Sequence, residues 1–100
     1  MTSGNDEPVT RPGWTFLSNH AHVLVCLDRD NDMTMREIAE QVGITLRAVQ
    51  KIVADLTADG YLRVQHRGRR NHYLLDGSRP LRHPLEAHAT TRQLLDAVKA

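Results

Sequence analysis

The chain has 100 residues, 40% of them hydrophobic, which suits one compact domain with a single core. Its longest uncharged apolar run, Val23 to Leu27, is far shorter than the ~20 residues that cross a bilayer, and the polar start from Thr2 to Glu7 lacks a signal-peptide pattern. We therefore expect a cytoplasmic protein with no membrane partner and, because Cys26 is the only cysteine, no internal disulfide.

The formal net charge of +1 conceals an asymmetry about Gly60. Residues 1–60 carry five Lys and Arg against nine Asp and Glu, a net −4, whereas residues 61–100 carry eight against three, a net +5. Six of those eight are arginines between Arg63 and Arg82. Such an asymmetry predicts one face that meets a polyanion.

The N-terminal part should contain a tail and a first helix. Residues 1–13 are rich in Thr, Ser, Gly, Asn and Pro and cannot bury enough apolar surface to become ordered, so we expect a flexible tail. Order is predicted to begin at Trp14, with Ser18 as the N-cap of the first helix. The acidic run at residues 28–32 should end that helix after its inward residues, which are Ala21, Val23, Leu24 and Leu27.

Two further helices are predicted on either side of a glycine. Thr34 and Glu37 fit a capping box, so a second helix of about two turns should start there. Gly43 offers a left-handed exit, Thr45 caps a third helix, and Gly60 closes it. The apolar residues at helical spacing are Met35, Ile38, Ala39, Val42, Leu46, Val49, Ile52, Val53 and Leu56.

The remaining elements are a hairpin and a last helix. Apolar and polar residues alternate from Tyr61 to His66, and His72 to Leu75 is the expected partner strand. The tip between them, Arg67 to Asn71, contains the glycine that a tight turn needs. One hypothesis that the sequence allows is that His66 and His72 lie opposite each other, which would make the wing sensitive to pH.

Segment 80–100 is predicted to hold a C-terminal helix beginning at Pro84, since proline suits a first helical turn. Its apolar side is broad and needs covering, which favours a dimerisation role. The apolar or small residues on that side are Leu85, Ala87, Ala89, Thr91, Leu94, Leu95 and Val98.

Two short helices joined by a glycine-containing turn, the second with a polar outer side, are typical of the helix-turn-helix that enters the major groove of DNA. Such helix pairs also occur in plain bundles, and the arginine-rich hairpin is what favours DNA. The predicted fold class is mainly α (α+β): three core helices, a small antiparallel β-hairpin and an added C-terminal helix, with residues 14–79 as the DNA-binding domain.

Over about residues 15–76 the chain resembles the winged helix-turn-helix domain of small transcription regulators of the MarR and ArsR kind, in the stretches REIAEQVGITLRAVQKIVADLTADGYL and RVQHRGRRNHYLL. The resemblance implies a recognition helix starting near Thr45, a wing at Arg67 to Asn71, and a short strand near Met33 that joins the hairpin. It also implies a homodimer formed through terminal helices. We expect a repressor, associated with the nucleoid, whose partner is double-stranded DNA.

Within the recognition helix, the residues not committed to the core form a candidate reading face: Thr45, Arg47, Ala48, Gln50 and Lys51. Arg47 can pair bidentately with guanine and Gln50 with adenine, each discriminating by about 1–3 kcal/mol. Lys51 and Thr45 suit phosphates, and Ala48 can touch a thymine methyl group. The alternative is an ordinary solvated helix face.

The wing arginines are harder to explain without a ligand, because Arg67, Arg69 and Arg70 repel one another unless an anion meets them. Together with Arg63 they are expected to contact phosphates or a narrow minor groove, and Asn71 to stabilise the turn. The alternative is a charged tip that protects a sheet edge from aggregation.

Other functions find less support in the sequence. The six histidines invite comparison with metal-responsive ArsR-like sensors, but their spacing does not favour a metal site. No Gly-rich phosphate loop or nucleophile elbow is present, so we expect neither an enzyme nor a cofactor, and no effector is indicated. The remaining alternative is a winged helix that docks a protein or RNA.

Overall fold

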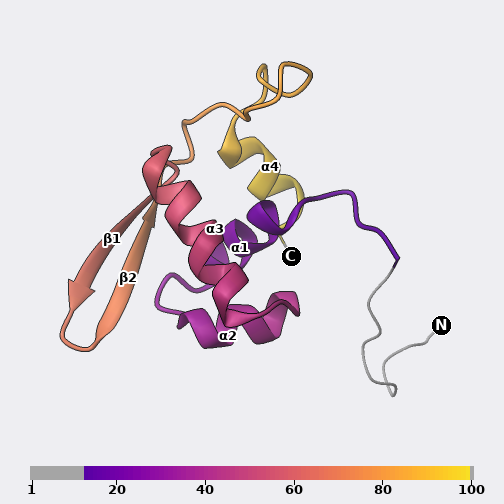
Figure 1. Ribbon diagram of the computed structural model, residues 1–100. Helices are drawn as coiled ribbons and strands as arrows, with labels where there is room; N and C mark the ends of the chain where they lie inside the picture. Colours follow the sequence, from indigo (N-terminus) through magenta and orange to yellow (C-terminus); the bar gives the residue numbers. More distant parts are fainter. Residues whose placement is uncertain (1–12, 100) are drawn as a thin grey trace.

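The computed structural model describes residues 13–99, which form four helices and one two-stranded antiparallel sheet (Figure 1). The elements in order are α1 (Asn19–Arg29), α2 (Met35–Val42), α3 (Leu46–Ala58), β1 (Leu62–Arg67), β2 (Arg70–Leu75) and α4 (Thr91–Ala97). This arrangement confirms the predicted α+β winged helix. The expected flexible tail lies outside the described residues except for Gly13.

Side-chain caps start the first two helices where the sequence predicts them. Ser18 caps α1 by accepting the N–H of Ala21, and the Thr34 hydroxyl accepts the N–H of Glu37 at 3.1 Å. The Thr34 N–H in turn donates to Glu37 Oε1 at 2.8 Å, which completes the predicted capping box. Gly43 ends α2 with φ 83°, a conformation that is costly for a residue with a Cβ.

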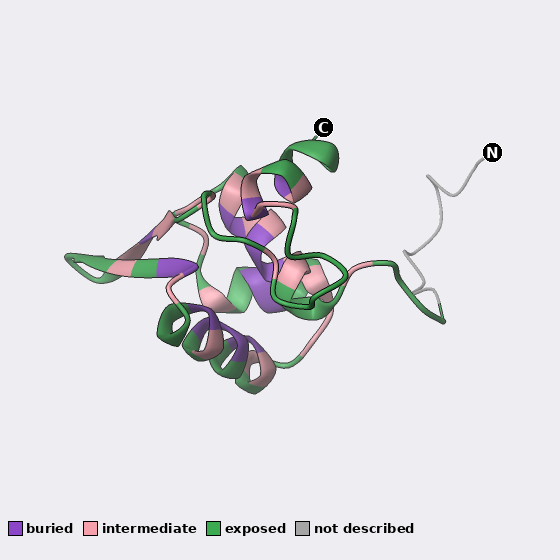
Figure 2. Cartoon of the chain, turned by 90° about the horizontal axis from the view of Figure 1, so that it is seen from above, coloured by how far each residue is buried: buried purple, intermediate pink, exposed green. Residues whose placement is uncertain are grey.

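One hydrophobic core joins the helices to the hairpin. Its most deeply buried apolar residues are at most 1% exposed: Val23, Leu27, Ile38, Val49, Tyr73 and Leu95. Figure 2 shows buried residues on the inner faces of the helices and at one end of the hairpin, whereas the hairpin tip is exposed. The core therefore fixes the helices and the hairpin relative to one another and leaves the tip free to contact a ligand.

The hairpin register corrects one prediction. Arg67 lies opposite Arg70 at the tip, and Gln65 lies opposite His72. Since facing residues of an antiparallel pair share one side of the sheet, His66 and His72 point to opposite sides. The prediction that these two histidines lie opposite each other is therefore wrong.

The strand that the resemblance implies near Met33 is also absent, because the sheet within residues 13–99 has two strands. The Met33 N–H donates to the Asp30 carbonyl at 3.2 Å, and the Asp32 N–H donates to the Asp30 carboxylate at 3.0 Å. These bonds fold the segment into a turn. Its backbone contact with the hairpin is one hydrogen bond from the Tyr73 N–H to the Asn31 carbonyl at 3.0 Å.

The C-terminal helix is shorter than predicted. It begins at Thr91 and not at Pro84, since Thr90 forms its N-terminal capping box. The preceding segment is a loop closed by a hydrogen bond from the Leu81 N–H to the Ala89 carbonyl at 3.0 Å. The Ala89 carbonyl therefore pairs with a residue earlier in the chain and not with the N–H of Gln93 four positions later, as it would within a helix.

An ion pair attaches α4 to α1. Arg92 donates from Nη1 and Nη2 to the two carboxylate oxygens of Asp28, at 3.0 and 2.7 Å, and the Asp28 side chain is only 13% exposed. These hydrogen bonds hold the pKa of Asp28 below its ordinary value of 3.8. Leu95, on the same helix, packs into the core.

We expect Asp28→Asn to lower the free energy of unfolding at pH 7 by about 1 kcal/mol, because a charge-assisted pair is lost at a partly solvated site. The depressed pKa of Asp28 means that its contribution is present above pH 3.8 and is lost as the pH falls through the lower folded-state pKa. Denaturant unfolding of both proteins should therefore give a difference that shrinks below that pH. A difference in unfolding free energy that stays the same below pH 3.8 would contradict this role of Asp28. The matched control is Asp96→Asn, which changes a more exposed carboxylate partner of Arg92.

Candidate nucleic-acid interface

The buried side of α3 determines which of its residues face solvent. The Thr45 hydroxyl caps the helix by accepting the Ala48 N–H at 3.0 Å. The residues that anchor α3 in the core are Val49, Ile52, Val53 and Leu56. Four residues of the predicted reading face are exposed, namely Thr45, Arg47, Gln50 and Lys51, and Ala48 is half-buried.

Three of these residues form one stripe along α3. Arg47, Gln50 and Lys51 are three and four positions apart, so their side chains lie on one face of the helix. Ala54, which is also exposed and lies seven positions after Arg47, continues the stripe. The sequence-based prediction omitted Ala54 although the helical spacing indicates it.

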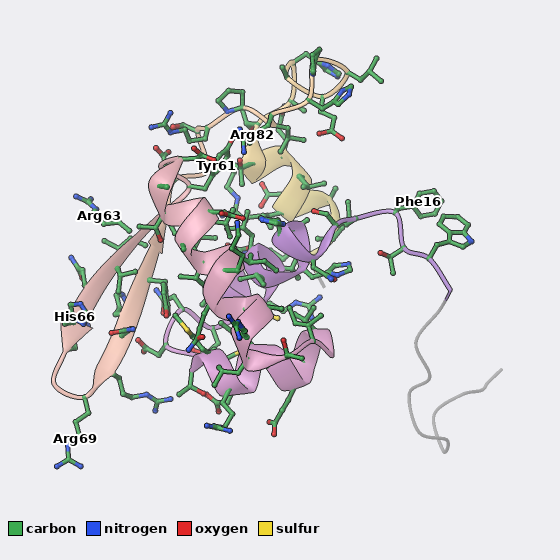
Figure 3. All side chains as sticks on the ribbon, in the orientation of Figure 1. Phe16, Tyr61, Arg63, His66, Arg69 and Arg82 are labelled. Carbon is green, nitrogen blue, oxygen red and sulfur yellow. The ribbon has the colours of Figure 1, made fainter. Side chains whose placement is uncertain are left out.

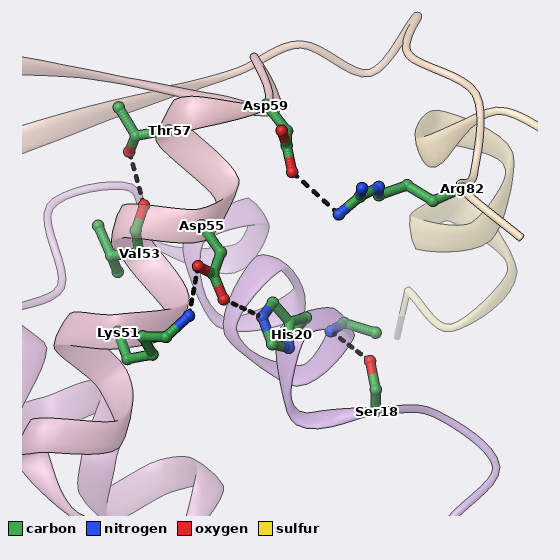
Figure 4. Close-up of polar contacts among 9 residues, drawn as sticks. Ser18, His20, Lys51, Val53, Asp55, Thr57, Asp59 and Arg82 are labelled. Carbon is green, nitrogen blue, oxygen red and sulfur yellow. Dashed lines mark hydrogen bonds and ion pairs between the residues drawn. The ribbon is translucent and has the colours of Figure 1, made fainter.

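Lys51 has an acidic partner. Its Nζ donates to Asp55 Oδ1 at 2.7 Å, and His20 Nε2 lies 2.9 Å from Asp55 Oδ2 (Figure 4). The hydrogen bonds from Lys51 and from His20 lower the pKa of Asp55. Because the Lys51 side chain is 73% exposed and surface pairs contribute little to stability, its ammonium can exchange this partner for a phosphate.

The hairpin turn gives the wing its shape. Gly68 has φ 61° and no other described residue of the turn has a positive φ, which corresponds to a type II′ turn with glycine first. Arg69 is the second residue of this turn, and Figure 3 shows its side chain pointing away from the protein. Asn71 lies in β2 opposite His66, outside the two-residue turn that it was expected to stabilise.

The wing concentrates positive charge. Arg67 and Arg70 face each other across the strands, an arrangement that like charges disfavour. Arg63, Arg67 and Arg69 make no ion pair with a carboxylate among residues 13–99. The hairpin therefore carries uncompensated positive charge at its exposed end.

Arg70 differs from the other wing arginines. Its Nη2 lies 3.5 Å from Glu37 Oε1, the oxygen that also accepts the Thr34 N–H in the α2 capping box. Hydrogen bonds from Thr34 hold the pKa of Glu37 below its ordinary value. Arg70 thus links the wing to the start of α2.

A histidine of the hairpin, His72 in β2, attaches it to the loop before α2. His72 Nδ1 lies 2.6 Å from Asp32 Oδ1, and its Nε2 lies 3.3 Å from the Asn31 amide nitrogen. The bond from His72 is the main cause that holds the pKa of Asp32 below its ordinary value. This contact was not predicted, because only the folded chain brings residues 40 positions apart together.

The two candidate DNA-contacting elements lie at one end of the molecule. In Figure 1 the hairpin turn points toward the same end as α2 and the N-terminal half of α3. The polar stripe of α3 and the wing arginines can therefore be presented together to one extended polyanion.

Within residues 13–99 no three His, Cys, Asp or Glu side chains are grouped to hold a metal ion. None of the described helices is long and apolar enough to span a membrane.

Residues 19–63 match a family model described as winged helix-turn-helix DNA-binding. The match begins at the first residue of α1, includes α2 and α3, and ends inside β1. No curated protein matches the chain. Over residues 19–63 the chain is therefore similar to winged helix-turn-helix domains of the DNA-binding type.

Proposed function

We propose that this protein binds duplex DNA in a sequence-specific manner and regulates transcription, with α3 in the major groove and the wing on the minor groove or backbone. The observation that best supports this proposal is the polar stripe of α3 at the same end of the molecule as the hairpin. Three hairpin arginines, Arg63, Arg67 and Arg69, lack ion-pair partners among the described residues. A solvated helix face alone would not account for the arginines, since their mutual repulsion is relieved only by an anion.

On this proposal the residues of α3 divide between bases and backbone. Arg47 and Gln50 have the donors and acceptors that read guanine and adenine edges, and Ala48 suits a thymine methyl group. Thr45 and Lys51 contact phosphates, Lys51 after releasing Asp55.

The hairpin contributes mainly to affinity. Arg67 and Arg69 contact phosphates or enter the minor groove, and Arg63 extends the contact along β1. Arg70, through Glu37, holds the wing in position for those contacts.

We also propose that residues 14–79 act as the reading domain of a homodimer, because one recognition helix and one wing cover few base pairs. The C-terminal segment, predicted at residues 80–100 to form the dimer contact, offers a partner less exposed apolar surface than its sequence indicates. Leu95 is only 1% exposed, because α4 packs against its own core, so the dimer contact needs further apolar surface.

Selection of bound fragments from a pool of random duplexes tests the proposal. The expected result is enrichment of one motif repeated as two half-sites about one helical turn apart. Retention of no duplex, or retention without any shared motif, would contradict sequence-specific binding.

Arg47→Ala is expected to weaken binding to the selected site and to relax the preference at one base pair by about 1–3 kcal/mol. Competition between the site and its single-base variants measures this. The matched control is Arg79→Ala, which removes an arginine paired with Asp76 at 3.8 Å. A variant Arg47→Ala that keeps the full preference at every position would refute the assigned role.

A further inference from the structure

A groove lies between the start of α1, the second half of α3 and the segment before and within α4. Its volume is about 630 Å³. The apolar lining includes Leu17, Ala21, Leu24, Leu56, Leu81 and Leu94. Of the charged residues at its rim, Asp55 is bonded to Lys51 and Asp59 to Arg82. The groove thus offers an apolar interior with a rim whose charges are largely compensated.

Beside this groove stands an aromatic arm, residues 14–16. Trp14 is 71% exposed and Phe16 is 92% exposed, and their rings meet edge to face with centroids 5.0 Å apart. Two adjacent, exposed aromatic rings are unusual on a monomer surface, where large apolar groups gather at sites of association. Figure 3 shows Phe16 directed away from the helices.

The arm is poorly placed to fill the groove of its own chain. Phe16 borders the groove but stays almost fully exposed, and only Leu17 separates it from Ser18, the N-cap of α1. A hydrogen bond from the Thr15 hydroxyl to the Leu17 carbonyl at 2.6 Å fixes this short connection. The connection between Phe16 and α1 is therefore too short for the Phe16 ring to turn back easily into the groove of its own chain.

We propose that Trp14 and Phe16 of one copy insert into this groove of a second copy, and reciprocally. Each aromatic side chain buries about 150 Å² or more and covers a similar area of its receptor. Two rings from each copy thus bury about 1,200 Å² in total, the lower limit of a stable protein interface. Reciprocal exchange is the two-fold arrangement that homodimers favour.

This exchange leaves the DNA-contacting end accessible. Figure 3 shows Phe16 and Arg69 on opposite sides of the molecule. This inference is about the interface of the proposed homodimer. It rests on the proposed function only in one respect, namely that the dimer is used to read two half-sites. Sedimentation without DNA tests the dimer, and binding to a short single half-site tests DNA recognition separately.

Trp14 is the only tryptophan of the chain, so its fluorescence reports on the groove contact directly. We expect the emission maximum to move to shorter wavelength as protein concentration rises, in parallel with dimer formation in analytical ultracentrifugation. Trp14→Ala with Phe16→Ala should weaken the dimer at least about tenfold. Trp14 emission that is already at short wavelength in the monomer would mean that the arm fills the groove of its own chain, and it would overturn the proposal. A protein that stays monomeric at every concentration would also overturn it.

A mixing experiment separates exchange from other dimers. Leu94→Glu blocks the groove but keeps the arm, whereas the Trp14→Ala, Phe16→Ala variant keeps the groove and has no tryptophan. Because only one of the two arm–groove contacts can form in this mixture, a large excess of the second variant, at concentrations above those that dimerise the parent, should shift the emission of Trp14 and produce a mixed dimer. Both variants should first show the helical circular dichroism of the parent, and the absence of a shift between folded variants overturns the proposal.

Discussion

Replacing both Arg67 and Arg69 with alanine is expected to weaken duplex DNA binding about 60-fold at 0.1 M salt. Each phosphate contact to duplex DNA contributes about −0.9 to the slope of log affinity against log salt. Two lost contacts should therefore make the slope shallower by about 1.8 and affect all sequences alike. Fluorescence anisotropy with a labelled duplex at several salt concentrations measures both quantities.

The control for this variant must remove the same charge elsewhere. Arg79 and Lys99 fit, because Arg79 pairs with Asp76 at 3.8 Å, Lys99 is exposed after α4, and neither side chain lines the groove. Their double alanine variant has the same net charge as the wing variant but should bind within a few-fold of the parent. Equal losses in the two variants would mean that overall charge, and not the wing, attracts DNA.

Tyr73→Ala is expected to lower the free energy of unfolding by about 3–5 kcal/mol, which is a large part of the stability of a domain this small. The Tyr73 side chain is 1% exposed, and on the same side of the sheet it faces Val64 across the hairpin. Its removal leaves a cavity between the hairpin and the helices, so the wing should also lose its fixed position.

Denaturant unfolding and hydrogen exchange of the β1 and β2 amides measure these two effects. Tyr73→Phe keeps the ring and should be nearly neutral. Leu85→Ala, at a leucine that is 81% exposed, controls for loss of apolar volume alone. A Tyr73→Ala protein as stable as the Leu85→Ala protein would contradict the role of Tyr73 in joining the hairpin to the core.

The features that the sequence predicts correctly depend on contacts within a few residues. Thr34 and Thr45 start their helices through bonds to N–H groups three positions later, and Gly43 ends α2 through its own backbone conformation. Helical spacing likewise identifies the buried side of α3 and, by exclusion, the exposed stripe from Arg47.

Contacts that form only in the folded chain explain the features that the sequence predicts wrongly or does not predict. The sequence predicts a C-terminal helix from Pro84, but the pairing of Leu81 with Ala89 holds that segment as a loop. The attachment of His72 to Asp32 likewise exists only in the folded chain. Neither contact leaves a periodic pattern in the sequence.

The aromatic arm and its groove belong to the same class of features. Trp14 and Phe16 are visible in the sequence, but their exposure and the apolar groove beside them are properties of the assembled fold. Interaction surfaces of this kind become apparent only when the core has been accounted for.

The most direct test of DNA binding is the salt dependence of the parent protein's affinity for a duplex. If the four basic residues Arg63, Arg67, Arg69 and Lys51 each meet a phosphate, log affinity should fall against log salt with a slope of about −3.6 or steeper. A measurable affinity at low salt with that slope supports the account. No binding at low salt, or an affinity that does not change with salt, would contradict it.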